Sequence, residues 1–236
     1  MSFVDQGSGR PLLLLHGGAG PASVRGIGAL LAADHRVVTP VHPGFDGTGR
    51  PPELDTIAGL ARHYAQLLDD LDLDDVVVVG NSIGGWIGAE LALLHSPRVG
   101  ALVLVDAVGL DLPDSPIVDF FSLTMDEVAE LSYRNPAAFR LDVASLPTEQ
   151  KAVMAGNRAA LQTYGGTTMS DPPLLGRLPA ITVPTSVVWG AADRIVPLAH
   201  GAAYANAIPD ARLTVLDAAG HLPQLETPHE LAELIP

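Results

Sequence analysis

Six short runs of leucine or β-branched residues constrain the fold of this chain more than any other feature of its sequence. Their apolar character is continuous rather than alternating, which predicts strands that are covered on both faces. Helix-like segments such as LDTIAGLARHYAQLLDDL and IGGWIGAELALLH lie between them, and this alternation predicts a parallel α/β sheet. The predicted strands are PLLLLHG near Leu12, HRVVTP near Val37, DVVVVG near Val76, ALVLVD near Leu102, TSVVWG near Val187 and RLTVLD near Leu213.

The alternation is interrupted once, between Gly109 and about Leu178, where no strand-like run occurs and prolines separate stretches of helix formers. We predict that residues 110–178 form a helical cap, inserted into a core made of residues 1–109 and 179–236. The 236 residues, 47% of them hydrophobic, fit one large domain with one substantial core. The expected architecture is a mostly parallel central sheet flanked by helices, with the cap inserted.

Terminal signals predict two helices within this cap. Thr124 and Glu127, in the sequence TMDE, fit a capping box in which each side chain bonds the other residue's free backbone N–H. Thr148 is predicted to cap the second helix, which we expect to stop at Gly165 and Gly166.

The cap also holds three of the five phenylalanines and three of the four methionines of the chain. These side chains either form the apolar lid of a pocket or only pack the cap against the sheet, since apolar residues must be buried somewhere. The residues in question are Phe120, Phe121, Phe139, Met125, Met154 and Met169.

The hexapeptide GNSIGG, from Gly80 to Gly85, stands where the strand DVVVVG gives way to a helix. In that setting G-x-S-x-G is typical of a nucleophile elbow, in which the serine takes a strained backbone conformation. Glycine at positions 80 and 84 removes Cβ atoms that would clash as strand and helix close around the serine. Ser82 is therefore the candidate nucleophile, and the Ile83 amide at the helix N-terminus is a candidate oxyanion donor.

A glycine-rich turn alone needs no chemistry, so the assignment depends on partners for the serine. A serine hydroxyl becomes a good nucleophile when a base takes its proton and an acid orients that base. Asp193 follows the strand TSVVWG and His221 follows the last strand, in the order Ser, Asp, His and at the strand ends where such sheets place their sites. Asp106, which ends ALVLVD, is the alternative acid.

The turn HGGAG, after the first predicted strand, is expected to supply the second oxyanion donor. We predict the Gly18 amide in this role, with the Ala19 amide as the alternative. His16 is expected to hold the turn through side-chain hydrogen bonds, and His42 or Phe45 could touch a ligand.

No metal or cofactor is expected. The chain has no cysteine, and no pair of its histidines has the HExxH spacing of a zinc site. Five further histidines stand where surface histidines are common: His35, His63, His95, His200 and His229.

The formal net charge of −14, with Lys151 as the one lysine, argues against nucleic acid or an anionic membrane as a partner. A small-molecule substrate is expected, and the oligomeric state stays open. The N-terminus MSFVDQGSGRPLLLLHGG lacks a basic leader followed by a long apolar stretch, and no apolar run approaches the roughly 20 residues of a membrane span. We therefore expect a soluble, cytoplasmic protein.

The chain resembles the α/β-hydrolase superfamily in six successive blocks: LLLLHGGAGP, VVTPVHPGFDGTGRP, VVGNSIGGWIGAELA, LVLVDAVG, VVWGAADRIVP and AAGHLPQLETP. The resemblance implies the α/β-hydrolase fold, with Ser82 as nucleophile, His221 as general base and acid, and Asp193 as its orienting acid. It also implies an oxyanion hole formed by the amides of Gly18 and Ile83. A serine nucleophile is unlike the dehalogenase and epoxide hydrolase branches, which use aspartate. GNSIGG is closer to carboxylesterases and to the carbon–carbon bond hydrolases of aromatic ring degradation.

Three functional hypotheses follow. The leading one is an enzyme that hydrolyses a small, largely apolar carboxylic ester through an acyl-enzyme. The second is a carbon–carbon bond hydrolase of ring-cleavage-type diketo acids, whose carboxylate requires a basic residue in the pocket. The third is a ligand receptor that retains the triad but has little turnover. For the second hypothesis, the cap offers four arginines: Arg134, Arg140, Arg158 and Arg177.

Overall fold

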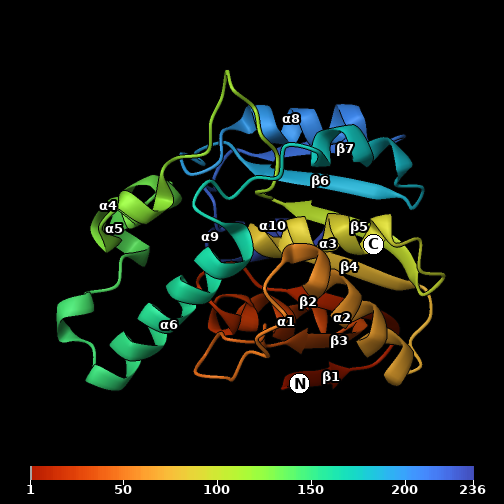
Figure 1. The fold of residues 1–236 in the computed structure, drawn as a ribbon, viewed down its shortest axis with the longest axis horizontal. Coiled ribbons are helices and arrows are strands. Elements are labelled where there is room, and N and C mark those ends of the chain that lie inside the picture. The colour runs from red at the N-terminus through yellow and green to blue at the C-terminus, as the bar shows by residue number, and fades with distance from the viewer. Residues whose placement is uncertain (1) are drawn as a thin grey trace.

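The computed structural model describes residues 2–236 and is built around one seven-stranded sheet (Figure 1). The strand order is β1-β3-β2-β4-β5-β6-β7, and every neighbouring pair is parallel except β1 with β3. All six predicted strands are confirmed as β2 to β7. The strands are β1 (Phe3–Gly7), β2 (Arg10–Leu15), β3 (His35–Pro40), β4 (Val76–Asn81), β5 (Val99–Val105), β6 (Thr185–Gly190) and β7 (Arg212–Leu216).

The apolar runs do not predict β1. Its sequence, FVDQG, mixes apolar and polar residues, and four of its five residues are exposed. This strand lies at the edge of the sheet, where it pairs antiparallel with β3 alone. Because it needs no apolar cover on both faces, it lacks the pattern that identifies the buried strands.

Two hydrophobic cores, one on each face of the sheet, explain the continuous apolar runs. In β2, Leu13 and Leu15 belong to one core, whereas Leu12 and Leu14 belong to the other. Successive side chains of a strand point to opposite faces, so a strand covered on both sides is apolar at every position.

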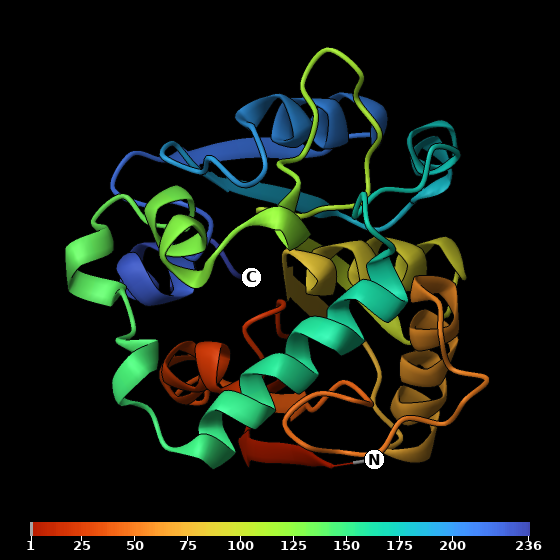
Figure 2. The same ribbon diagram turned by 60° about the vertical axis from the view of Figure 1, so that its left-hand side comes forward.

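Helices cover both faces (Figures 1 and 2). Residues of α2, α3 and α8 belong to the larger core, and residues of α1 and α10 belong to the smaller one. The α-helices outside residues 110–178 are α1 (Arg25–Leu31), α2 (Ile57–Asp70), α3 (Ile83–Leu93), α8 (Leu198–Ala207), α9 (Pro223–Glu226) and α10 (Pro228–Ala232).

Residues 110–178, here called the cap segment, connect β5 to β6 and lie beside one end of the sheet (Figures 1 and 2). Their main elements are helices, as the sequence predicts. The long helix α6 crosses the front of the molecule in Figure 2. The α-helices of the cap segment are α4 (Met125–Ser132), α5 (Pro136–Phe139), α6 (Thr148–Gly165) and α7 (Leu174–Arg177).

The helix ends of the cap segment follow the predicted signals with one exception. The capping box of Thr124 and Glu127 is confirmed at the start of α4. The stop is also confirmed, because α6 ends at Gly165 and Gly166 follows with a φ of 66°. The prediction for Thr148 is wrong: it is the first residue of α6, and the capping position belongs to Pro147, whose side chain has no hydrogen-bonding atom.

An ion pair connects the end of the cap segment to α3. Both Nη atoms of Arg177 donate to the carboxylate of Glu90, with Nη1 and Oε2 2.8 Å apart. The Glu90 side chain is only 8% exposed, whereas that of Arg177 is 41% exposed. Arg177 also pairs with Asp171, so this arginine joins two parts of the chain to a buried carboxylate.

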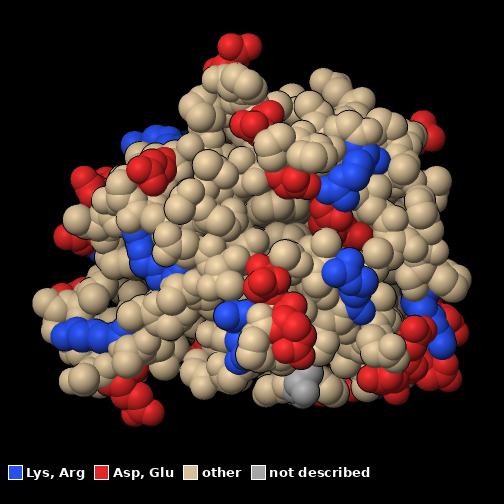
Figure 3. Space-filling view, viewed as in Figure 1, with Lys and Arg blue, Asp and Glu red and all other residues tan. Residues whose placement is uncertain are grey.

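Charged side chains of both signs are interspersed on the face viewed in Figure 3. Within residues 2–236, each helix is too short or too polar to cross a membrane.

Replacing Arg177 by leucine should lower the free energy of unfolding by about 2–3 kcal/mol, a value already reduced for the partial exposure of Arg177. The loss arises because Glu90 remains buried without its cation. The measurement is urea unfolding followed by circular dichroism. The control is Arg140→Leu, which removes more exposed ion pairs with Asp126 and Glu130 and should cost less than about 1 kcal/mol. Equal losses in the two variants would contradict the prediction.

Candidate active site

The turn that carries Ser82 is closed too tightly for a side chain at two of its positions. Ser82 lies between β4 and α3 with a φ of 55° and a ψ of −119°, a backbone conformation that side chains disfavour. A Cβ atom on Gly80 would lie 2.2 Å from the carbonyl oxygen of Gly84. A Cβ atom on Gly84 would lie 2.3 Å from the carbonyl oxygen of Leu15. The glycines of GNSIGG therefore have the steric role that the sequence predicts for them.

The structure brings Asp193 and His221 together by a hydrogen bond. The Nδ1 atom of His221 lies 2.8 Å from Oδ2 of Asp193. The other oxygen, Oδ1, accepts the backbone N–H groups of Ile195 at 2.8 Å and Val196 at 2.9 Å. Ser82 and His221 line the same cavity, but within residues 2–236 no hydrogen bond joins their side chains.

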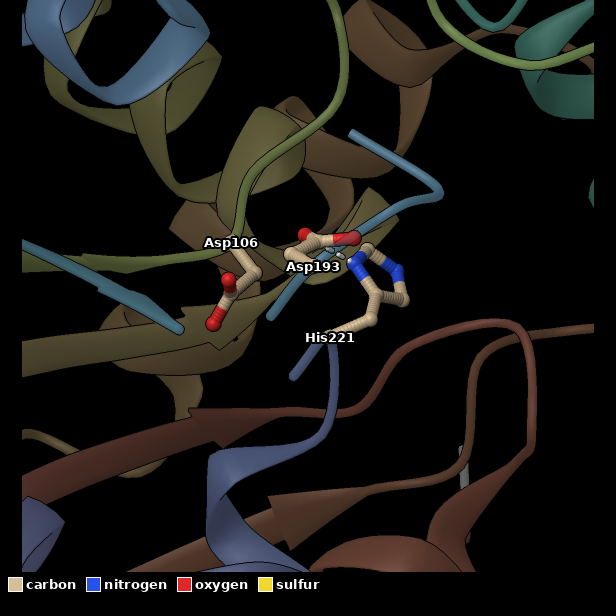
Figure 4. A group of neighbouring side chains, drawn as sticks. All are labelled: Asp106, Asp193 and His221. Carbon is tan, nitrogen blue, oxygen red and sulfur yellow. Dashed lines mark hydrogen bonds and ion pairs between the residues drawn. The ribbon is translucent and has the colours of Figure 1, made fainter. Parts of the chain in front are cut away.

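Asp106, the alternative acid, does not occupy the place of Asp193. Its Oδ1 atom accepts the N–H of Gly190 at 2.8 Å, and the Nδ1 atom of His221 is bonded to Asp193 instead. Figure 4 shows Asp193 between Asp106 and the imidazole ring. Within residues 2–236, Asp106, Asp193 and His221 are also the one group of at least three acidic or histidine side chains whose ligand atoms lie close enough together to hold a metal ion.

Asn81 fixes the backbone of the loop that carries His221. Its Nδ2 atom donates to the carbonyl oxygens of His221 at 3.0 Å and of Val105 at 3.3 Å. Its Oδ1 atom accepts the side-chain amide of Gln224 at 3.0 Å. No sequence pattern predicts a role for Asn81 or Gln224. The only signal available was the position of Asn81 inside the GNSIGG motif, where the serine pattern accepts any residue.

The cap segment also contacts the loops of His221 and Asp193. The His221 N–H donates to the carbonyl oxygen of Ser132, at the end of α4, at 2.6 Å. The Arg194 N–H, one residue after Asp193, donates to the carbonyl oxygen of Leu131 at 3.1 Å. Both loops are therefore bonded to the same helix end.

The two predicted oxyanion donors have free backbone amides. Neither the Gly18 N–H nor the Ile83 N–H has a hydrogen-bond partner in residues 2–236. Gly18 and Ala19 line the cavity together with Ser82, and Ile83 is the first residue of α3, where helical N–H groups lack intrahelical acceptors. Both amides are thus without a partner in residues 2–236, but of the two residues only Gly18 lines the cavity, and Ile83 is not among its lining residues.

A buried cluster of His16, His42 and Tyr64 supports the turn that contains Gly18. His16 bonds the carbonyl oxygen of Gly17 through Nδ1 and accepts the His42 N–H through Nε2. His42 in turn bonds Tyr64 and the carbonyl oxygen of His16. Burial lowers the pKa of His16 to about 4 and the pKa of His42 well below its ordinary value, with the nearby His16 as a second cause for His42. The expected holding role of His16 agrees with these bonds.

A cavity of about 210 Å³ lies between the sheet and the cap segment. It is lined by Gly18, Ser82 and His221 of the core. Neither His42 nor Phe45, the two residues considered as ligand contacts, is among its lining residues. Five of the six bulky apolar cap residues singled out in the sequence line it: Phe120, Phe139, Met125, Met154 and Met169.

Of the four cap arginines, Arg158 is the one that lines the cavity. Its Nη2 atom donates to the carbonyl oxygens of Phe120 at 2.9 Å and Leu123 at 3.1 Å, and its guanidinium lies 5.0 Å from the centre of the Phe120 ring. Within residues 2–236 it forms no ion pair, unlike Arg140 and Arg177, which pair with acids.

One of the five histidines expected at the surface is buried. His200, in α8, is inaccessible to solvent, and its Nε2 atom lies 2.7 Å from the carbonyl oxygen of Ser115. The expectation failed because the loop before the cap helices folds back over α8, a contact between segments 85 residues apart that no local pattern indicates.

Comparisons with known proteins agree with this architecture. A family model described as alpha/beta hydrolase fold matches residues 10–228. The 2-hydroxymuconate semialdehyde hydrolase of Pseudomonas putida is 31% identical, over 98% of this chain and 87% of that protein. The 2-hydroxy-6-oxo-6-phenylhexa-2,4-dienoate hydrolase of Burkholderia cepacia is 31% identical, over 94% of this chain and 85% of its own. The structure of a thermophilic esterase from Thermogutta terrifontis matches with a TM-score of 0.79 and 24% identity, over 99% of this chain and 90% of its own.

Acid should destabilise the protein before its carboxylates titrate. An unfolded histidine has a pKa near 6.5, whereas burial lowers the pKa values of His16 and His42 in the folded protein. Between about pH 6.5 and 4, these two residues therefore bind more protons in the unfolded chain than in the folded one, which favours unfolding. Their stabilising contribution is complete above about pH 6.5 and is lost as the pH falls. Urea unfolding should show a free energy about 2–3 kcal/mol smaller at pH 5.5 than at pH 7.5.

The exposed His229 supplies the control, because His229→Asn should leave this difference unchanged. A free energy of unfolding that is the same at both pH values would show that the cluster takes up protons in the folded state.

Proposed function

We propose that this chain, which belongs to the α/β-hydrolase family, is a serine hydrolase that cleaves a carbon–carbon bond of a 2-hydroxy-6-oxo-dienoate acid. In this proposal Ser82, His221 and Asp193 act as the catalytic triad. The two relatives with 31% identity support it, because they are hydrolases of 2-hydroxymuconate semialdehyde and of 2-hydroxy-6-oxo-6-phenylhexa-2,4-dienoate. The second hypothesis from the sequence thus becomes the leading one.

The observation that carries the proposal is the position of Arg158. The chain is acidic, yet the cavity that contains Ser82 and His221 holds an arginine that no carboxylate of residues 2–236 neutralises. Only its Nη2 atom is used in bonds to the protein, so Nη1 and Nε remain available as donors. A guanidinium with free donors is suited to a carboxylate, which an acidic substrate has and a simple apolar ester lacks.

The reaction begins at the C6 carbonyl of the substrate. Ser82 Oγ bonds to C6 while His221 Nε2 accepts the serine proton, and the negative charge that forms on the carbonyl oxygen is stabilised by the amides of Gly18 and Ile83. Asp193 fixes the tautomer of His221 and stabilises its protonated form through the bond to Nδ1.

The bond between C5 and C6 then breaks. This step requires the 2-oxo tautomer of the substrate, in which the proton of the 2-hydroxyl group has moved to C5, so that C2 is a carbonyl and the double bond lies between C3 and C4. The electron pair left on C5 is then delocalised through the C3–C4 bond onto the C2 carbonyl, whose oxygen takes the proton from His221. Arg158, beside the carboxylate, would also stabilise the charge that reaches the C2 oxygen. Water, deprotonated by His221, finally hydrolyses the acyl-serine to release a carboxylic acid.

Hydrolysis of a carboxylic ester is the second candidate. The same nucleophile, base and oxyanion donors serve that reaction, and the observation that favours it is the apolar wall of Phe139, Met125 and Met154, which suits an uncharged acyl group. The two candidates differ in what they require of Arg158, because a neutral ester has no carboxylate for it to bind.

The proposal is tested by supplying 2-hydroxy-6-oxo-6-phenylhexa-2,4-dienoate and a series of p-nitrophenyl esters, from acetate to decanoate, to the purified protein in the presence of a chelator. Decay of the dienoate absorbance, at a higher kcat/KM than for any ester, is the expected result. In Ser82→Ala both activities should fall by at least about 10³-fold. Ester turnover alone would favour the second candidate, and saturable binding of the dienoate without turnover would favour the receptor hypothesis.

Arg158→Leu should raise KM for the dienoate about 10–100-fold while changing KM for the esters little, because the variant loses charge-assisted bonds that only the acid makes. Steady-state kinetics with both substrates measure this difference. Arg134→Leu is the matched control: this arginine is in the same segment, is exposed, and lies outside the cavity lining. A loss of equal size for the acid and the esters would contradict the role of Arg158.

A further inference from the structure

A second carboxyl group is buried beside the proposed catalytic pair, and the mechanism does not use it. Asp106 directly follows β5, is inaccessible to solvent, and has a φ of 46°, which side chains disfavour. One oxygen of Asp106, one oxygen of Asp193 and one nitrogen of His221 all lie within 4.8 Å of one another (Figure 4). Two carboxylates this close and this buried cannot both remain ionised near neutral pH, because their repulsion is little screened.

The hydrogen bonds decide which of the two is ionised. Asp193 receives three donors: the N–H groups of Ile195 and Val196 on one oxygen and Nδ1 of His221 on the other. Asp106 receives one, the N–H of Gly190 on Oδ1, and its Oδ2 is buried with no partner. Donors stabilise a carboxylate anion, whereas an oxygen without a donor is suited to carry a proton.

We propose that Asp106 is a positioning residue that acts as a neutral carboxylic acid: it holds the end of β6 through Gly190 and leaves Asp193 as the only anion of the buried cluster. The catalytic part of this inference rests on the proposed function. The protonation state itself does not.

The other titratable groups around Asp106 agree with this assignment. Asp193 follows β6, His221 follows β7, and Glu226 ends α9. The pKa of Asp106 is raised well above its ordinary value, mainly by burial and then by the negative charges of Asp193 and Glu226. The pKa of His200 in α8 is lowered by burial, which outweighs the raising effect of the charge of Asp193, so this histidine is neutral. No arginine or lysine of residues 2–236 pairs with Asp106.

A neutral Asp106 has two effects on the site. First, the side-chain Oδ1 of Asp106 accepts the Gly190 N–H and so fixes the last residue of β6, after which the loop of Asp193 begins. The Asp193 N–H in turn donates to the backbone carbonyl oxygen of Gly190 at 3.1 Å. Second, the protonated oxygen of Asp106 adds no further negative charge near His221. The imidazole therefore faces one negatively charged aspartate rather than two.

Asp106→Asn separates the neutral from the ionised form, because a carboxamide has the shape of a protonated carboxyl and also lacks charge. Infrared spectroscopy at pH 8 should detect the carbonyl band of a protonated carboxylic acid in the parent protein, and the band should be lost in Asp106→Asn. It should persist in Asp34→Asn, whose aspartate is exposed and belongs to another loop. Absence of the band from the parent protein would overturn the proposal.

The pKa of His221, followed by NMR, gives a second readout that needs no turnover. If Asp106 is already neutral, Asp106→Asn should shift this pKa by less than about half a unit. Removal of an ionised neighbour would lower it by about 1–3 units. A downward shift of half a unit or more therefore overturns the proposal, even if the protein proves inactive toward dienoates, which would overturn only the proposed reaction.

The positioning role is tested by Asp106→Leu, which removes the acceptor for Gly190. Its kcat should fall at least about 10-fold further than that of Asp106→Asn, with KM changed less than kcat. Equal kcat in the two variants would overturn the positioning role. If Asp106→Leu fails to fold, the infrared band and the His221 pKa of Asp106→Asn still decide the protonation state.

Discussion

The close backbone approach around Ser82 is the constraint on which the rest of the site depends. Carbonyl oxygens of Gly84 and Leu15 fill the space where side chains at positions 80 and 84 would begin, so β2, β4 and α3 meet at one point. That approach holds Ser82 at positive φ and leaves the first N–H of α3 without an acceptor. The strain is sustained because β4 is a central strand, paired with β2 and β5, and α3 is buried along its length.

Hydrogen bonds connect the loops of His221 and Asp193 to the turn of Ser82 and to the cap segment. Asn81, next to Ser82, holds the carbonyl oxygen of His221, and the carbonyl oxygens at the end of α4 hold the His221 and Arg194 N–H groups. Glu226 adds a further connection, since its carboxylate accepts the N–H groups of Gly220 and of two cap residues after α4. The cap segment therefore both lines the cavity and supports the loops that carry Asp193 and His221.

Burial selects which groups near the site are charged. His16 and His42 are kept neutral because the interior gives an imidazolium no anionic partner. Three hydrogen-bond donors surround the carboxylate of Asp193, and two carbonyl oxygens and two aromatic rings surround the guanidinium of Arg158. The cavity lining thus includes one arginine that no carboxylate of residues 2–236 pairs with.

The sequence by itself determined the parallel sheet, because strands covered on both faces must be apolar at every position. It also determined the turn around Ser82, because only glycine fits at positions 80 and 84. It placed Ser82, Asp193 and His221 after strands of one parallel sheet, which meet at one edge. It favoured Asp193 over Asp106 as the partner of His221, but it could not single out Arg158 among four arginines, or find Asn81 and the buried His200. Those outcomes depend on contacts between residues far apart in the chain, and only the tertiary structure decides which side chain points into the cavity and which backbone group it meets.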